Sequence, residues 1–267
     1  MMRRLLIAAL VLAAGLASAQ GVKRLNFYAT EKQVGIEVED EQTFTNAVVK
    51  YPFNYDFDAG TNYLDASAAV NDGTQATANS RPSFVADDGT TSAHYDFDGT
   101  DDYVRSSAVQ SNDFPASFTA MAWVNSDAAS TFQVAVGNQE SAFPDDNRSF
   151  ELRVTAANFL SLGIIDSSGT FASVTGTTTV NTGQWTHVAG VYDDAGNTKE
   201  VFINGVSDGS SAQASIRTAD SSTEIGRREV TANFHWNGQI DDVRIYGRAL
   251  TTAEIAAIHS ATSGAHP

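Results

Sequence analysis

The sequence predicts an all-β domain in which two antiparallel sheets pack as a sandwich, followed by one short C-terminal helix. Many short stretches rich in β-branched and aromatic residues are separated, roughly every 8–12 residues, by turn signals of glycine, asparagine and aspartate. The chain is 42% apolar and 18% charged, a composition that allows a domain to bury a core. A helix start signal stands out only near the C-terminus.

The first 19 residues have the pattern of a secretory signal peptide. Met1–Arg4 is basic, Leu5–Leu16 is an apolar run, and Ala17–Ala19 has the small residues of a cleavage site. The apolar run is shorter than the about 20 residues that span a bilayer, and the chain has no cysteine for a lipid anchor or a disulfide. We therefore expect a protein secreted through a bacterial-type signal peptide, extracellular or periplasmic, without membrane insertion.

Residues 20–47 are the least regular part of the chain. Gly35–Glu39 alternates like a short strand, but Glu37–Glu41 is an acidic run without a turn signal. We expect a flexible or loosely docked arm here, with an added strand as the alternative. The sandwich domain is expected over residues 48–260, followed by a tail at 261–267.

A series of strands is expected through the first two thirds of the domain, each bounded by turn residues. They are Val49–Phe53, Tyr103–Val104, Ser117–Val124, Val134–Val136, Phe150–Val154, Phe159–Ile165 and Phe171–Val174. Within Ser117–Val124, Phe118 and Val124 fall on one face and Trp123 on the other. We therefore expect a second layer over this strand.

An antiparallel meander is expected next. Gly183–Tyr192 and Glu200–Ile203 read as strands joined by a short turn. Asn204–Gly205 predicts a second turn, because both residue types tolerate the positive φ of a tight hairpin. Asn237–Gly238 has the same pattern, so a hairpin turn is expected there as well.

The last strand is expected at Ile240–Tyr246, and large side chains fall on both of its faces. Strict alternation places Ile240, Asp242, Arg244 and Tyr246 on one face and Asp241, Val243 and Ile245 on the other. Thr251 and Glu254 then have the spacing of a capping box, so a short helix should follow.

These segments resemble a known family. "GQWTHVAGVYDDAGNTKEVFINGVSDG", "NGQIDDVRIYGRALTTAEI" and, upstream, "YDFDGTDDYV" are similar to laminin G-like, concanavalin A-like jelly-roll domains of the pentraxin-related branch found in secreted bacterial proteins. The resemblance covers roughly Val48–Ile258. It implies the jelly-roll form of the sandwich, but not one function, because this fold hosts lectins, adhesion modules and enzymes.

The charge of the chain argues against one class of partner. With 32 acidic and 16 basic residues the net charge is −16. Such a chain repels phosphate backbones and anionic membranes, so nucleic-acid binding is not expected. The same excess of carboxylates suits divalent cations.

Signatures of catalysis are missing from the sequence. It contains no HExxH, GxSxG, P-loop or GxGxxG motif, and its five histidines are scattered, with His187 expected to be packed. Retaining glucanases of this fold carry a Glu-x-Asp-x-x-Glu strand, which this chain lacks. The glutamates of the domain stand alone in the sequence, namely Glu140, Glu151, Glu200, Glu224, Glu229 and Glu254. We therefore expect a protein that is not an enzyme.

Aspartate-bearing loops predict a structural calcium site, because calcium prefers carboxylate and carbonyl oxygens. The candidate ligands are Asp65, Asp98, Asp101, Asp102, Asp241 and Asp242. In calcium-binding relatives a carboxylate beside the final "VRIY" strand often holds the ion, together with groups near the start of the domain. The resemblance therefore implies Asp241 or Asp242, and then Asp65, as metal ligands.

Ligand recognition is expected in polar loops. The candidates are Asp145, Asn147, Arg148, Arg227, Arg228 and His235, whereas Trp236 stands where the family places a buried aromatic. The expected function is recognition of an extracellular glycan or cell-surface adhesion. A structural module that binds a surface protein is the main alternative, and a glycoside hydrolase or polysaccharide lyase of the same fold is the other.

Overall fold

The computed structural model describes residues 80–86, 92–106, 117–128, 131–139, 149–217, 222–228 and 234–266, together with the backbone of the strands within 24–74. The expected signal peptide, residues 1–19, lies outside the described residues. The chain divides into two compact units, residues 1–46 and 47–267. Within the described ranges, no helix has both the length and the apolar content that a bilayer crossing requires.

The first unit contains a β-hairpin. Strand β1 (Arg24–Ala29) pairs antiparallel with β2 (Val34–Glu39), from Arg24 opposite Glu39 to Ala29 opposite Val34. The alternating stretch Gly35–Glu39 therefore belongs to a strand, and its partner β1 was not predicted from the sequence.

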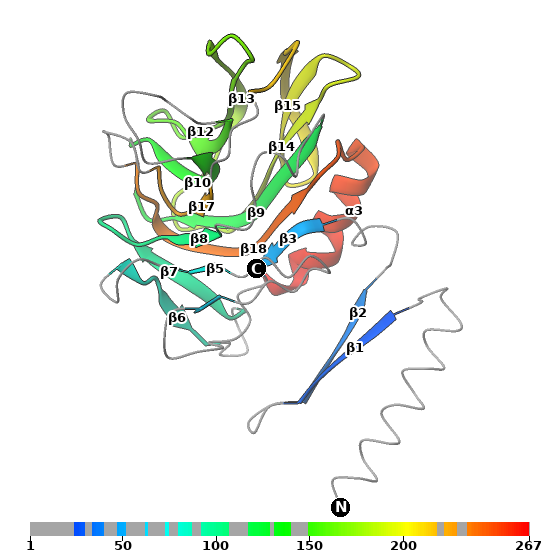
Figure 1. Cartoon of the computed structure of the whole chain (residues 1–267). Helices are drawn as coiled ribbons and strands as arrows, with labels where there is room; N and C mark the ends of the chain where they lie inside the picture. Colours follow the sequence, from blue (N-terminus) through cyan, green and yellow to red (C-terminus); the bar gives the residue numbers. More distant parts are fainter. Residues whose placement is uncertain are drawn as a thin grey trace, which may run out of the picture. The chain divides into compact units, whose positions relative to one another are not determined.

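The second unit consists of two antiparallel sheets packed face to face (Figure 1). Sheet 1 has the order β13 (Phe171–Thr179), β12 (Phe159–Ile165), β11 (Phe150–Val154), β10 (Gln133–Gln139), β17 (Ser222–Ile225), β8 (Val104–Ser106), β5 (Gly73–Thr74) and β4 (Asn62–Tyr63). Sheet 2 has the order β16 (Val206–Ala212), β15 (Thr198–Ile203), β14 (Thr186–Asp193), β9 (Phe118–Ser126), β18 (Asn237–Tyr246), β7 (His94–Asp98) and β6 (Ser83–Val85), and β3 (Ala47–Tyr51) pairs with β18. The predicted two-sheet sandwich is confirmed.

The core lies between the two sheets and is built from alternating positions of their strands. Phe118 and Val124 of β9 are fully buried there, and Leu152 of β11 is part of the same core from sheet 1. Trp236, which precedes β18, is also fully buried in this core, as expected. The meander was predicted correctly too, and Asn204 and Gly205 adopt the positive φ angles of its turn, 49° and 77°.

Helix α3 (Thr252–Thr262), with the 3-10 turn η3 (Ser263–Ala265), packs on the other side of sheet 2 (Figure 1). The predicted capping box is present, because Thr251 and Glu254 each accept a hydrogen bond from the other's backbone. Trp123 of β9 donates from Nε1 to Oγ1 of Thr262 at 2.8 Å. The expected second layer over β9 is therefore confirmed, and both faces of this strand are covered. Sheet 1 covers one face and α3 covers the other.

Strand β18 corrects the prediction of a hairpin turn at Asn237–Gly238. Both residues lie within the strand, opposite Asp98 and Phe97 of β7. Gly238 does have a positive φ, 125°, and a Cβ there would lie 2.3 Å from the carbonyl oxygen of Asn125. Glycine is required at this position because β18 approaches β9 closely, not because the chain reverses.

A β-bulge also changes the expected faces of β18. Asp242 has a φ of 49°, and the register with β9 shifts between Asp241 and Arg244. The extra residue places Ile240 on the core side together with Val243, although strict alternation put these two on opposite faces.

Candidate functional site

The face of sheet 1 that points away from the core carries a row of residues in register. On strand β10, Gly137 pairs with Glu151 of β11 on one side and with Glu224 of β17 on the other. Glu224 in turn pairs with Arg105 of β8. Because Leu152 points into the core, its neighbour Glu151 points to the other side of the sheet. Glycine in the middle of the row leaves the two glutamates as neighbouring side chains across β10.

Glu224 is fully buried and is held by two arginines. Its Oε1 accepts hydrogen bonds from Nε of Arg105 at 2.7 Å and from Nη2 of Arg227 at 3.1 Å, and its Oε2 accepts from Nε of Arg227 at 3.2 Å. Burial removes water from a carboxylate, and these charge-assisted hydrogen bonds replace that hydration.

Glu151 has the same arrangement on the other side of Gly137. It is buried, its Oε1 accepts a hydrogen bond from Nη1 of Arg153, and its Oε2 accepts from Nη1 of Arg228 at 3.4 Å. We call this set the arginine face, and it consists of Arg105, Glu151, Arg153, Glu224, Arg227 and Arg228.

Aromatic rings orient the guanidinium groups of this face. Arg227 lies 3.3 Å from the ring centroid of Tyr103, and Arg228 lies 4.1 Å from that of Phe234. Guanidinium groups bind aromatic faces through cation–π attraction, so each arginine is fixed by a ring as well as by a carboxylate.

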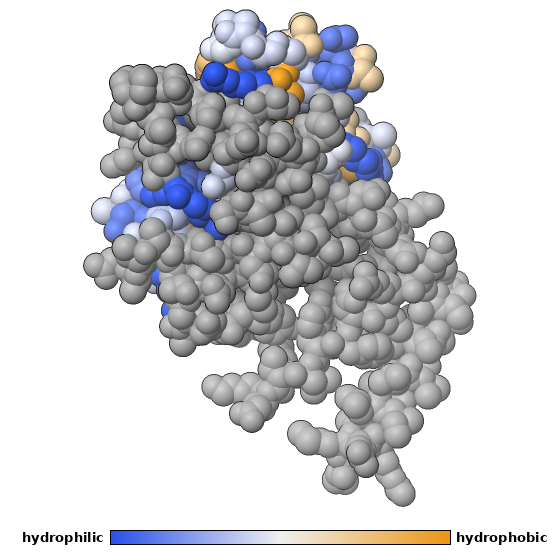
Figure 2. All heavy atoms as spheres, viewed as in Figure 1, coloured by the Kyte–Doolittle hydropathy of each residue, from blue (hydrophilic) through white to orange (hydrophobic). Residues whose placement is uncertain are grey.

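Arg153 lies between two partly exposed phenylalanines. Its guanidinium carbon is 5.3 Å from the ring centroid of Phe132 and 5.2 Å from that of Phe171, and each of these two residues is 38% exposed. In the view of Figure 2 the described surface is mostly hydrophilic, and its few orange atoms lie among blue and white ones. Large apolar side chains are exposed at four described positions, Val85, Phe132, Phe171 and Val206, and two of them flank Arg153.

Two of the residues predicted to bind a ligand, Arg227 and Arg228, are part of the arginine face. The predicted His235 is half-buried beside it, and burial together with the charge of Arg227 lowers its pKa. The predicted loop residues Asp145, Asn147 and Arg148 lie outside the described residues.

Sequence reasoning missed the rest of this face. Glu151 and Arg153 occupy the polar positions of the alternating stretch Phe150–Val154, which is a usable signal for one face of one strand. That Glu224 lies in the same row depends on how β10 pairs with both neighbours, and no local pattern encodes that pairing.

The expectation that the glutamates stand alone is wrong for this pair, because Glu151 and Glu224 flank Gly137 in one row. Paired carboxylates are the tools of glycoside hydrolysis. Here, however, all four carboxylate oxygens accept hydrogen bonds from arginines. Chemically, the pair holds guanidinium groups in place.

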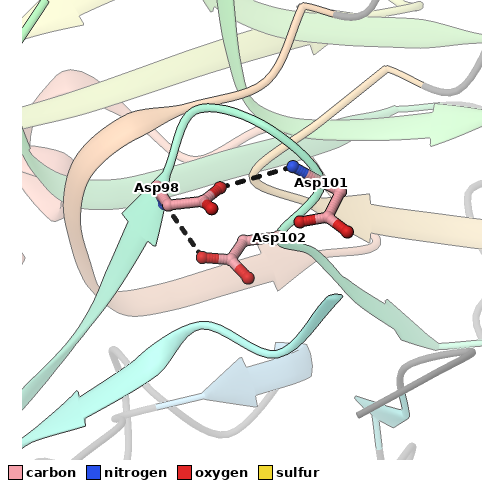
Figure 3. A group of neighbouring side chains, drawn as sticks. All are labelled: Asp98, Asp101 and Asp102. Carbon is pink, nitrogen blue, oxygen red and sulfur yellow. Dashed lines mark hydrogen bonds between the residues drawn. The ribbon is translucent and has the colours of Figure 1, made fainter. Parts of the chain in front are cut away.

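A second candidate site is the loop after β7, where three aspartates converge (Figure 3). Asp98, Asp101 and Asp102 each offer a carboxylate oxygen within 4.8 Å of the others. Burial, together with the charges of Asp98 and Asp101, raises the pKa of Asp102 to about 6. Three hard oxygen donors fit calcium, and a cation there would relieve the repulsion that raises this pKa.

The two carboxylates that the resemblance implied as metal ligands are engaged by protein groups. Both oxygens of Asp242 accept from Arg244, at 2.9 and 2.6 Å. Asp241 accepts from the Asp242 backbone at 2.7 Å through Oδ1, and Oδ2 lies 2.8 Å from Nε2 of His266. Their role as calcium ligands stays a prediction. Asp98 and Asp102 also accept hydrogen bonds, but from backbone N–H groups at 2.7–3.3 Å and not from a charged side chain. The predicted Asp65 lies outside the described residues.

Three of the five histidines, which are scattered in the sequence, gather under helix α3, where His266 reaches Asp241. The ring of His266 stacks on Trp123 with centroids 4.4 Å apart, and the rings of His187 and His259 lie 5.4 and 5.5 Å from the same indole. His187 is buried, as expected. This group packs α3 and η3 against sheet 2.

Comparison with solved structures supports the fold. The binding domain of paraclostridial mosquitocidal protein 1 aligns with a TM-score of 0.62 and 16% identity, over 82% of this chain and 53% of that one. The receptor-binding domain of botulinum neurotoxin type G aligns with a TM-score of 0.59 and 12% identity, over 81% and 51%. This chain therefore spans about half the length of both.

A third similar structure is domain 4 of AbnA, an extracellular GH43 arabinanase from Geobacillus stearothermophilus, solved in complex with arabinotriose. It aligns with a TM-score of 0.58 and 20% identity, over 80% of this chain and 98% of that one. No curated protein matches the sequence. The family description "Concanavalin A-like lectin/glucanases superfamily" matches residues 98–256, more than half of the chain. The chain belongs to the concanavalin A-like lectin/glucanase superfamily.

Proposed function

We propose that this protein is a secreted, non-catalytic module that binds an extracellular glycan on the arginine face. The observation that carries the proposal is Arg153 between the exposed rings of Phe132 and Phe171. Sugar rings present apolar C–H faces and a rim of hydroxyl groups. Exposed aromatic rings beside fixed hydrogen-bond donors match both features.

Two of the similar structures are named as binding domains, and the arabinanase domain was solved with a bound arabinotriose. Their identities to this chain are 20% or less, so they supply a precedent for the fold, not a ligand. Secretion rests on the signal-peptide pattern of residues 1–19. Calcium at the three converging aspartates is proposed as a structural support for the module.

Binding can be tested with the purified domain on a glycan array, followed by titration calorimetry with the best ligand. We expect Phe171→Ala to weaken binding about 2–12-fold, from roughly 0.5–1.5 kcal/mol of lost aromatic contact. Val206→Ala is the matched control, because Val206 is exposed on sheet 2 and should not matter. If the domain binds no glycan on the array but does bind a surface protein, the adhesion alternative is favoured.

Hydrolysis is a second candidate, and the Glu151 and Glu224 pair is the observation that favours it. We propose instead that the pair orients arginines, so the protein should release no reducing ends or unsaturated products from polysaccharides. Turnover that disappears in Glu151→Gln or Glu224→Gln, while a Glu200→Gln control keeps it, would show that the module is an enzyme.

A further inference from the structure

We infer that the outer face of sheet 2 carries a second glycan site, which binds a neutral oligosaccharide across strands β7, β18, β9 and β14. The outer face is the one that points away from the core. These four strands are neighbours in sheet 2 (Figure 1), whereas the arginine face belongs to sheet 1. The site therefore goes beyond the proposed function, and either site can exist without the other.

A row of polar side chains crosses this outer face and ends at a tryptophan. Asp96 of β7 pairs with Gln239 of β18, and Gln239 pairs with Asn125 of β9. The register between β9 and β14 places Trp185, which directly precedes β14, beside Asn125. We call these four residues the amide row, and all four are partly exposed. Their neighbours in the chain belong to the core, so the row points to the other side; these neighbours are Tyr95, Val124 and Ile240.

Trp185 is fixed at the end of the row by two buried histidines. Its indole ring lies edge-on to His94 and His266, with ring centroids 5.4 and 5.0 Å apart. Packing thus holds the indole in one orientation, although Trp185 stays partly exposed. An aromatic ring that is already fixed loses little entropy when a ligand stacks on it.

Several hydrogen-bonding groups of the amide row have no partner within the residues that the structure describes. Gln239 donates from Nε2 to Asp96 at 2.7 Å and to Asp127 at 3.2 Å, and its Oε1 accepts no hydrogen bond there. The side chain of Asn125 makes no hydrogen bond in the same part of the chain. Its Oδ1 is buried, so its amide nitrogen is the atom that a ligand can meet. With the indole N–H of Trp185, the row offers both donors and acceptors.

This mixture of groups matches hydroxyls better than it matches ions. A hydroxyl both donates and accepts, whereas an ammonium group only donates and a carboxylate only accepts. Asp96 and Asp127 repel anions, as does the net charge of −16. A sugar has hydroxyls around its rim and an apolar C–H face for the indole, so a neutral saccharide fits the whole row.

The length of the row requires more than one sugar ring. Adjacent strands lie about 4.8 Å apart, so the row extends over about 14 Å from β7 to β14. A single ring can stack on Trp185 or bond to Gln239, but it cannot do both. We therefore expect an oligosaccharide that lies across the strands.

Fluorescence quenching gives a readout for this site alone. The chain has 3 tryptophans, and Trp123 and Trp236 are 2% and 0% exposed, so a soluble quencher such as acrylamide acts mainly on Trp185. The probes are cellotetraose, xylotetraose, mannotetraose and arabinotetraose. We expect at least one of them to protect Trp185 from the quencher, and its monosaccharide to bind at least about tenfold more weakly.

Variants locate the site, with affinities measured by calorimetry. Asn125→Ala should weaken binding of the protecting tetrasaccharide about 2–12-fold through one lost hydrogen bond. It should leave the melting temperature unchanged, because this amide has no partner in the described structure. Trp185→Ala should weaken binding about tenfold, and its melting curve shows whether the loss of packing on the histidines unfolds it. Phe171→Ala on the arginine face is the control and should bind as the unsubstituted protein does.

The outcomes separate the two glycan sites. If no tetrasaccharide protects Trp185, the second site does not exist, and a glycan whose binding is lost in Phe171→Ala leaves the proposed function standing. If Asn125→Ala weakens glycan binding and Phe171→Ala does not, the amide row binds the glycan and the arginine face does not.

Two further results would overturn the inference. If poly-L-lysine protects Trp185 as well as the best tetrasaccharide does, the carboxylates of Asp96 and Asp127 recruit a cation, and the ligand class is wrong. If folded Asn125→Ala and folded Trp185→Ala both bind the tetrasaccharide with unchanged affinity, the saccharide does not use this row.

Discussion

His187 shows how burial decides the charge of a single residue. Its ring lies between sheet 2 and α3, near Asp242, Arg244, His259 and His266, and its Nδ1 has no hydrogen-bond partner in the described structure. Burial lowers its pKa from 6.5 to about 3, and nearby positive groups add to this against the attraction of Asp242. The folded protein therefore resists protonation of this histidine, while the unfolded chain does not.

This pKa shift predicts a pH dependence with a definite sign. Stability from a neutral His187 is complete above pH 6.5 and is lost as the pH falls toward 3, by about 2 kcal/mol between pH 7.5 and pH 5. Asp241 and Asp102 act in the opposite direction, because burial raises the pKa of each to about 6 and their contributions fall as the pH rises from 3.8 to 6. The unsubstituted protein should therefore show a weak net dependence in this range.

His187→Leu separates the two effects. Urea unfolding at pH 7.5 and pH 5 should show the variant gaining about 2 kcal/mol relative to the unsubstituted protein at the lower pH. A constant difference between the two proteins at both pH values would mean that folding does not shift the pKa of His187.

The sequence correctly predicted that certain single residues are buried, but it did not predict which residues they contact in the folded protein. The packing of His187 followed from its place in a predicted strand, and that of Trp236 from the resemblance, which implied a buried aromatic there. That His187, His259 and His266 would share one indole could not be foreseen, because α3 returns to β9 only in three dimensions. The row of Glu151 and Glu224 could not be predicted for the same reason, because it depends on the pairing of β10 with β11 and β17.

Strand β18 shows that a local sequence signal can be recognised correctly while the structural reason inferred for it is wrong. Asn237–Gly238 correctly marked a glycine with positive φ, but the turn was inferred because turns are the usual reason for it. The actual reason is the backbone of β9, 2.3 Å from where a Cβ would lie. Likewise, the bulge at Asp242 shifts the alternation by one residue, so face assignments hold only as far as the first bulge.

Two glycines distinguish strain in φ from steric overlap. Gly169 also has a positive φ, 87°, but nothing lies within 4 Å of its Cβ position. We expect Gly169→Ala to cost about 1 kcal/mol from the backbone conformation alone, and Gly238→Ala to cost roughly 3 kcal/mol or more. Urea denaturation measures both, and equal costs would show that β9 moves aside easily.

For the whole molecule, the charge is the dominant property. A net charge of −16 opposes compaction, and the three aspartates after β7 concentrate that repulsion at one loop. A bound cation would convert this unfavourable feature into a stabilising one. Whether a cation binds at this loop, beside Asp241 and Asp242, or at neither place can be decided by stability measurements.

Calcium should therefore raise the melting temperature, and chelation should lower it. Extracellular calcium sites have dissociation constants of roughly 10⁻⁴–10⁻³ M, and calcium at about 10 to 100 times the constant stabilises the folded state by roughly 1.4–2.7 kcal/mol. For a domain of about 200 residues this corresponds to about 3–10 °C. Magnesium should restore little of the difference, because it prefers a tighter octahedron than loop oxygens supply.

Two substitutions assign the site. Asp98→Asn should remove most of the difference between calcium and chelator, because it takes one charge from the converging aspartates. Asp242→Asn should lower the melting temperature by the same amount in both conditions, since its carboxylate is bound to Arg244 in either case. If Asp242→Asn removes the calcium effect instead, the ion lies beside the final strand, as the resemblance implied. If sodium chloride at matched ionic strength stabilises as well as calcium does, the effect is screening of the net charge, and no specific site exists.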